Sequence, residues 1–312
     1  MNAGRRKRKT KGAAGIPMAG WSFLRGPGGR ALAAVAIVGA LVGGAVYGWR
    51  RWGLEITDRP EYRLEAENIE ITPPPPWIRA EKLKAEVVRD GHLGGRSILD
   101  RQLTIDVAEA FTRHGWVKAV TRVTKRPPAR VAVEIVYRKP VAMVEVVIDG
   151  QPGLLPVDGE GVLLPPEDFA PEQARAFPRI SVAGATPTGA VGTPWGDRRI
   201  AGAARIAAVL LEHWPRLGLY RIALHRTADS GTPAGEPTYD LVTRSGARVI
   251  WGRAPRPDDV QRPGAIDKVA RLLAYVETNG SLESMEKTTE LDLRPPTAVT
   301  PRAATPVTGI AP

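Results

Sequence analysis

The chain of 312 residues contains no cysteine. This absence excludes disulfide bonds, thiolate zinc sites, iron–sulfur clusters and cysteine nucleophiles from its chemistry. Histidine is scarce as well, because only His92, His114, His213 and His225 occur, and none stands at the spacing of a two-histidine metal motif. The sequence therefore predicts no metal centre and no cofactor.

The motifs of catalysis and nucleotide binding are also missing. The chain has no G-x-S-x-G nucleophile elbow, no Walker A loop and no dinucleotide-binding fingerprint. Its neighbouring carboxylates, such as Asp158 with Glu160 or Asp258 with Asp259, stand in turn-like stretches where acidic residues are common without a catalytic reason. We therefore predict a protein that is not an enzyme, has no catalytic residues and binds no small-molecule substrate.

Negative charge is absent from residues 1–30, although the whole chain holds 33 acidic residues. Eight basic residues lie in this tail, so most of the formal net charge of +11 belongs to it, and the chain from Trp52 onward is nearly neutral. Three interpretations are open: a cytoplasmic stop for membrane insertion, binding to anionic lipid headgroups, and binding to nucleic acid. We favour the cytoplasmic stop, which is compatible with contact to membrane lipid, and we predict no nucleic-acid partner, because an apolar segment follows the tail.

The uncharged segment 31–49 runs from Ala31 through Leu41 to Trp49. As a helix it would be roughly 28 Å long, close to the roughly 30 Å hydrocarbon core of a bilayer. A buried helix of a soluble protein and a cleaved signal peptide are the alternatives. The run is longer than the core of a signal peptide, however, and bulky aromatic residues and two arginines follow it. We predict an uncleaved transmembrane helix, with residues 1–30 in the cytoplasm and the bulk of the chain outside it.

Hydrophobic periodicity divides the rest of the chain into two domains. After a polar connector over 50–61, a first domain over 62–140 is expected to contain two helices and three strands. Its helices are predicted at 78–88 and 99–111, the second ending near a left-handed Gly115, and its strands at 62–71, 116–124 and 130–137. The order strand–helix–helix–strand–strand is typical of a compact two-layer α/β unit.

The second domain, over 141–294, is predicted to be a mixed, β-rich domain with two helices. The fold class is therefore α+β: a single N-terminal transmembrane helix, a β-α-α-β-β domain and this β-rich domain. Residues 177–190 are predicted to be mostly loop, and residues 295–312 a disordered tail. The predicted strands are 141–148, 154–157, 162–164, 219–226, 238–244, 247–251 and 289–294, and the helices are 198–214 and 265–278.

The motifs of both domains, in this order, resemble the FtsQ/DivIB family of bacterial cell division proteins. Each motif alone is short, but together they extend over about 230 residues, from Tyr62 to Arg294. The stretches similar to the POTRA domain of that family are 116–120 (WVKAV), 126–133 (RPPARVAV) and 137–142 (YRKPVA). Those similar to its β domain are 155–163 (LPVDGEGVL), 177–180 (FPRI) and 291–294 (LDLR).

The resemblance implies a non-catalytic scaffold at the division site of the cytoplasmic membrane, with its domains in the periplasm. Its implied partners are other single-pass division proteins and septal wall synthesis proteins. Members of the family dock partners through a strand edge of the β domain, by main-chain hydrogen bonding. We place a hypothetical docking edge at Leu291, Asp292, Leu293 and Arg294; the alternative is that both leucines belong to the core. The alternative function is a POTRA-containing module for protein export or envelope assembly.

Overall fold

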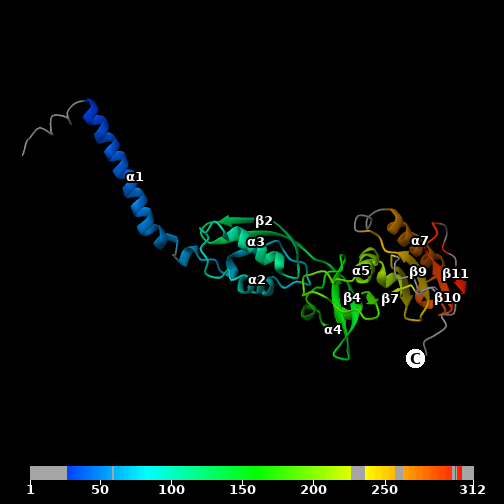
Figure 1. Ribbon diagram of the computed structural model, residues 1–312. Coiled ribbons are helices and arrows are strands. Elements are labelled where there is room, and N and C mark those ends of the chain that lie inside the picture. The colour runs from blue at the N-terminus through cyan, green and yellow to red at the C-terminus, as the bar shows by residue number, and fades with distance from the viewer. Residues whose placement is uncertain are drawn as a thin grey trace, which may run out of the picture. The chain divides into compact units, whose positions relative to one another are not determined.

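The computed structural model describes residues 27–57, 60–225, 236–256, 263–296, 299 and 301–303. These residues form seven α-helices and two β-sheets, so the fold is mixed α/β (Figure 1). The chain divides into two compact units, Met1–Tyr62 and Arg63–Pro312, which are described separately. Most of the basic tail, residues 1–26, lies outside the described residues, as do Asp258 and Asp259.

Helix α1, Pro27–Thr57, dominates the first unit. Its segment Ala31–Arg50 is long and apolar enough to cross a membrane, as judged by length and composition, and this agrees with a single-pass membrane protein. Ala31, Leu41 and Trp49 are all exposed on this helix. The helix continues past the apolar segment to Thr57, so the first part of the predicted connector 50–61 is helical. The first proline beyond the apolar segment, which would end a helix, is Pro60.

The first sheet of the second unit has the strand order β1-β3-β2, with β1 parallel and β2 antiparallel to β3. Helix α3 packs against β2 and against α2, and the apolar side chains of both helices are buried together with Val131 and Val133 of β3. The element order expected from the sequence is confirmed here. The elements are β1 Ile69–Ile71, α2 Ala80–Asp90, α3 Leu103–Arg113, β2 Val117–Arg126 and β3 Arg130–Tyr137.

Two details of this first domain differ from the sequence prediction. The strand expected over 62–71 is reduced to Ile69–Ile71, because a 3₁₀ turn at Ala66–Asn68 precedes it. Gly115 is not left-handed, since only Gly95 has a positive φ among the glycines of this domain. A side chain at position 115 would instead meet Val191 at 2.7 Å and Pro165 at 3.1 Å. Glycine is therefore required there for the close approach of two loops of the second domain.

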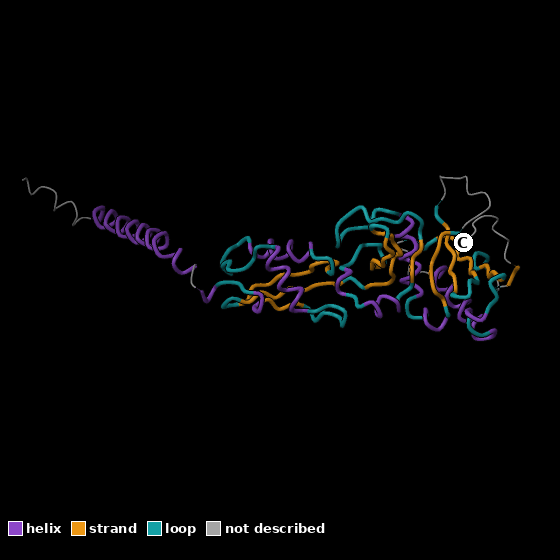
Figure 2. Tube along the Cα trace, turned by 90° about the horizontal axis from the view of Figure 1, so that it is seen from below, coloured by secondary structure: helices purple, strands orange, loops and turns teal. Residues whose placement is uncertain are grey.

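The second sheet has eight strands in the order β11-β10-β9-β8-β7-β6-β4-β5. The neighbours β4/β6, β6/β7 and β9/β10 are parallel, and the remaining neighbours are antiparallel. Figure 2 shows these strands in orange with the helices beside them. The strands are β4 Pro140–Ile148, β5 Gln151–Asp158, β6 Arg179–Ser181, β7 Leu219–Leu224, β8 Thr238–Thr243, β9 Arg248–Arg253, β10 Thr289–Asp292 and β11 Pro301–Ala303.

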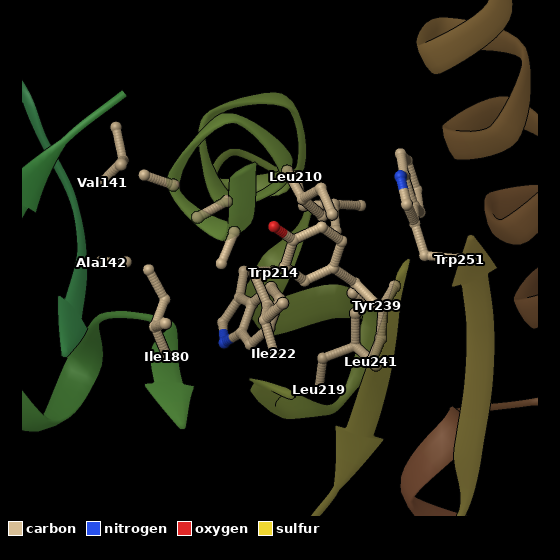
Figure 3. Packing of buried hydrophobic residues seen from close by; sticks show 14 of the residues in the cluster. Val141, Ala142, Ile180, Leu210, Trp214, Leu219, Ile222, Tyr239, Leu241 and Trp251 are labelled. Carbon is tan, nitrogen blue, oxygen red and sulfur yellow. The ribbon is translucent and has the colours of Figure 1, made fainter. Parts of the chain in front are cut away.

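The core of this domain lies between the sheet and helices α5 (Arg198–Leu210) and α7 (Pro263–Asn279). Figure 3 shows Leu210 and Trp214 gathered with Ile222 and Leu241 from neighbouring strands. The helix-covered face of the sheet is apolar, whereas the opposite, outer face carries charged residues such as Glu145 beside apolar ones such as Met143.

Two predictions for this domain are wrong, and two short strands were not predicted. The domain has four helices instead of two, because α4 (Pro171–Ala176) is added and the expected helix 198–214 stops at Leu210, before α6 (Trp214–Leu217). The stretch 162–164 contributes only isolated bridges. The stretch 177–190 is mostly loop, as expected, but contains β6, and residues 301–303 of the tail form β11. Both missed strands have three residues, which is too short for an alternating pattern to be recognised.

Candidate partner-binding edge

Strand β10 carries the residues predicted to bind a partner, and it lies inside the sheet. On one side its residues Glu290, Leu291 and Asp292 pair with β9 in parallel register. On the other side β11 pairs antiparallel, with Leu291 opposite Pro301 and Glu290 opposite Arg302. Among the described residues, the outermost strand at this end of the sheet is therefore β11, one strand further out than the sequence indicated.

Leu291 and Leu293 are fully buried members of the hydrophobic core. The amide of Leu293 donates a hydrogen bond to the carbonyl of Ile250 at 3.0 Å, which continues the β9–β10 ladder by one residue. The guanidinium of Arg271 on α7 donates hydrogen bonds to the carbonyls of Leu293 and Pro295. The two leucines thus anchor this end of the sheet and are not accessible to a partner, as the alternative interpretation held.

Asp292 and Arg294 form a bidentate ion pair at the same place. The Nε and Nη2 atoms of Arg294 donate to the two carboxylate oxygens of Asp292 at 2.9 and 2.7 Å, and its amide donates at 3.0 Å. These hydrogen bonds lower the pKa of the Asp292 carboxyl below its ordinary value of 3.8. Arg302 of β11 approaches the same carboxylate to 3.9 Å, so the charge of Asp292 also helps to hold β11.

A second charge network joins β8, β9 and β10 on the outer face of the sheet. Arg248 forms ion pairs with the buried Asp240 and, at 3.1 Å, with Glu290. The Nδ1 atom of His225 lies 2.7 Å from Asp240. These contacts link β8, β9 and β10, and Asp240 has two partners, Arg248 and His225. The network therefore fixes the register of the strands next to β11.

Asp158 and Glu160, which the sequence analysis placed only in a turn, form contacts where the two sheets meet. Asp158 does accept hydrogen bonds from the amides of Glu160 and Val162, as a turn residue would. It also lies 2.6 Å from Arg138, and Glu160 lies 2.8 Å from Lys118, so both acids connect the two domains. No local pattern could reveal these pairs, because the partners are separated by 20 and 42 residues.

The comparisons with known proteins add no relative. The chain matches no protein-family model, and a search of the curated proteins finds no match. Within the described ranges, no group of three or more histidine, aspartate and glutamate side chains is placed to hold a metal ion.

Proposed function

We propose that this chain is a non-catalytic, single-pass membrane scaffold of the bacterial division machinery. In this proposal residues 62–140 form a POTRA domain and residues 141–294 an FtsQ-type β domain, both in the periplasm. The two domains recruit and link septal proteins: other single-pass division proteins and septal wall synthesis proteins. The basic tail stays in the cytoplasm and faces anionic lipid.

The observation that carries the proposal is the order of the elements behind one apolar helix. The unit β1-α2-α3-β2-β3, with β1 parallel to the central β3, continues directly into β4 of a mixed sheet. The sequence Leu-Asp-Leu-Arg begins in β10, the strand next to β11 in that sheet, and continues two residues beyond it. This order agrees with the resemblance in the sequence, where the same motifs follow one another.

We place partner docking at the open side of β11. An exposed strand recognises an extended segment through its main-chain hydrogen bonds, and alternate side chains add specificity. Strand β11 is held by its pairing with β10 and by the approach of Arg302 to Asp292. A partner strand added there would extend the eight-stranded sheet without disturbing the buried leucines.

The first test is the location of the chain in its own bacterium. A fluorescent fusion at the cytoplasmic N-terminus should form a ring at mid-cell, and removal of residues 62–137 should abolish that ring while membrane insertion persists. A uniform envelope signal from the intact chain would contradict the division proposal and favour a role in protein export or envelope assembly.

The second test addresses the docking edge. Deletion of residues 301–312, which removes β11, should abolish co-purification of septal proteins with the chain. Deletion of residues 304–312 is the matched control, since it retains β11 and should retain capture. Equal capture by the two deletions would place the docking surface elsewhere.

A further inference from the structure

A second surface, on the outer face of the same sheet, gathers positive charge around one aromatic ring. We call "basic cluster" the side chains of Arg179 on β6, Arg221 on β7, Arg244 just after β8, and Tyr220. The guanidinium carbons lie 4.9, 5.3 and 5.1 Å, respectively, from the centroid of the Tyr220 ring. Each cation is attracted by the ring, but the three cations repel one another.

The strand register places two of these arginines directly opposite each other. Arg179 and Arg221 are cross-strand partners in the parallel pair β6/β7, and like charges directly opposite each other destabilise a sheet. Glu145 on β4 compensates, at 3.3 Å from Arg179 and 3.9 Å from Arg221. Among the described residues it is the one carboxylate paired with the cluster, so three guanidinium groups share a single acid.

The cluster also has hydrogen-bond donors that no described residue pairs with. The Nε atoms of Arg179 and Arg221 are buried and have no partner among the residues that the structure describes. The same side chains remain 22% and 41% exposed, so an external acceptor can reach their guanidinium groups. A surface with surplus donors and surplus positive charge is complementary to carboxylates.

An apolar cavity of about 900 Å³ lies beside the cluster and shares Glu145 and Arg179 with it. Its lining comes from strands β4 and β5 and from Phe169, Pro171 and Ala174 in the segment after β5. Its volume falls within the range of roughly 300–1,000 Å³ that is usual for ligand pockets. A bound peptide can place apolar side chains in this cavity while its neighbouring carboxylates pair with the arginines.

We propose that this surface binds a segment of a partner protein in which acidic residues adjoin apolar ones. The apolar side chains enter the cavity, and the carboxylates pair with Arg179, Arg221 and Arg244. Charge complementarity selects this occupant, and the apolar cavity favours a peptide over a nucleic acid or a free anion. The proposal goes beyond the scaffold function and uses a different surface from β11, so either can fail alone.

The test is binding of a fluorescent peptide to the full chain in detergent micelles, measured by anisotropy. The probe is a short peptide of leucines followed by glutamates, and the comparison peptide has glutamine in place of every glutamate. We expect the double variant Arg179→Gln, Arg221→Gln to bind the acidic peptide at least about tenfold more weakly, because two charged contacts are lost. Arg216→Gln is the control, since Arg216 is an exposed arginine paired with Glu277 elsewhere, and it should bind as the wild type does.

Glu145→Gln separates a binding role from a structural one. If the cluster binds carboxylates, Glu145 competes with the peptide for the arginines, so its removal should tighten binding of the acidic peptide about threefold. If the cluster only stabilises the fold, the same variant should destabilise the chain and bind the peptide more weakly. Thermal midpoints of all variants show whether they are folded. Equal binding of the glutamate and glutamine peptides, wild-type affinity in a folded double variant, or weaker binding by a folded Glu145→Gln variant would overturn the proposal. So would binding to anionic lipid vesicles, through the same arginines, in place of the peptide.

Discussion

At the residue scale, the carboxylate of Asp158 illustrates how burial changes what a charge contributes. It lies where the two sheets meet, with its side chain 6% exposed, and its partner Arg138 is 12% exposed. Two amide groups also donate to it, so its lone pairs are satisfied by both domains. Removal of either partner would leave a charge in a site from which water is largely excluded.

Replacement Arg138→Ala should therefore lower the free energy of unfolding by about 3 kcal/mol, because a buried carboxylate loses its counter-charge. Urea unfolding of the full chain in detergent, followed by tryptophan fluorescence, measures the loss. Arg122→Ala is the matched control, since the Arg122–Glu134 pair is 3.8 Å long and exposed, and it should cost less than about 0.5 kcal/mol. Losses of equal size would show that the buried pair is not the cause.

The Asp292–Arg294 pair gives a prediction for pH dependence. Because the pKa of Asp292 is lowered in the folded chain, the pair stabilises the fold above the ordinary value of 3.8 and loses this effect as the pH falls through the lowered pKa. Arg294→Gln should thus reduce stability at neutral pH, by about 0.5–1 kcal/mol for a half-exposed arginine, and the difference should vanish in acid. Urea titrations at several pH values test this, and a difference that grows on acidification would contradict it.

At the element scale, the turn after β5 sets the distance of helix α5 from the sheet. Gly161 has a φ of +76°, and a β-carbon there would lie 2.8 Å from the Cα of Ala201 on α5. Gly150, in the β4–β5 hairpin, has nearly the same φ of +77° but open space around it. The two glycines therefore have nearly the same positive φ, and a side chain would meet the helix at Gly161 alone.

Gly150→Ala should cost about 1 kcal/mol, the price of a left-handed residue with a side chain. Gly161→Ala should cost about 2–4 kcal/mol, because α5 must also move away from its place on the core. Urea unfolding of both variants measures the difference between them. The steric explanation fails if Gly161→Ala is no more destabilising than Gly150→Ala.

Elements with a long periodic pattern were predictable from the sequence, and short or non-local ones were not. The stripe Val107, Ala110 and Phe111 indicated α3, and the alternation of Val131, Val133 and Ile135 indicated β3. Strands β6 and β11 escaped, because three residues show no period and their place depends on distant partners. For the same reason the sequence indicated a strand edge at Leu291 to Arg294 but could not show that β11 pairs with this strand.

At the scale of the whole molecule, polar contacts join the two sheets into one compact unit, Arg63–Pro312. Asp168 receives a hydrogen bond from the Trp116 indole at 2.7 Å and an ion pair from Lys82, whose pKa it raises. The Trp116 ring also contacts Phe169, with centroids 5.8 Å apart. Trp116 and Lys82 belong to the first domain, whereas Asp168 and Phe169 follow β5 in the second. These contacts therefore couple the two domains through one short stretch of chain.

Asp168→Ala should uncouple the domains, because Trp116 and Lys82 both lose their partner. We expect the calorimetric unfolding transition of the full chain to broaden or split into two. Asp90→Ala, which removes an exposed pair with Arg89 inside the first domain, should leave the transition unchanged in shape. An unaltered single transition in Asp168→Ala would show that the domains are coupled by other contacts.

The short strand β6 has a consequence for how the chain folds as it is made. Strand β6 pairs in parallel with both β4 and β7, so the two halves of the sheet are joined only through Arg179–Ser181. Parallel neighbours cannot be closed by a tight hairpin, and such distant pairings form slowly. As the chain is made from its N-terminus, the β4–β5 hairpin has an unpaired edge until residues 179–181 follow, and β6 then has an unpaired edge until residues 219–224 follow. The rate of synthesis over these stretches therefore sets how long the nascent chain is open to aggregation, and to capture by a chaperone.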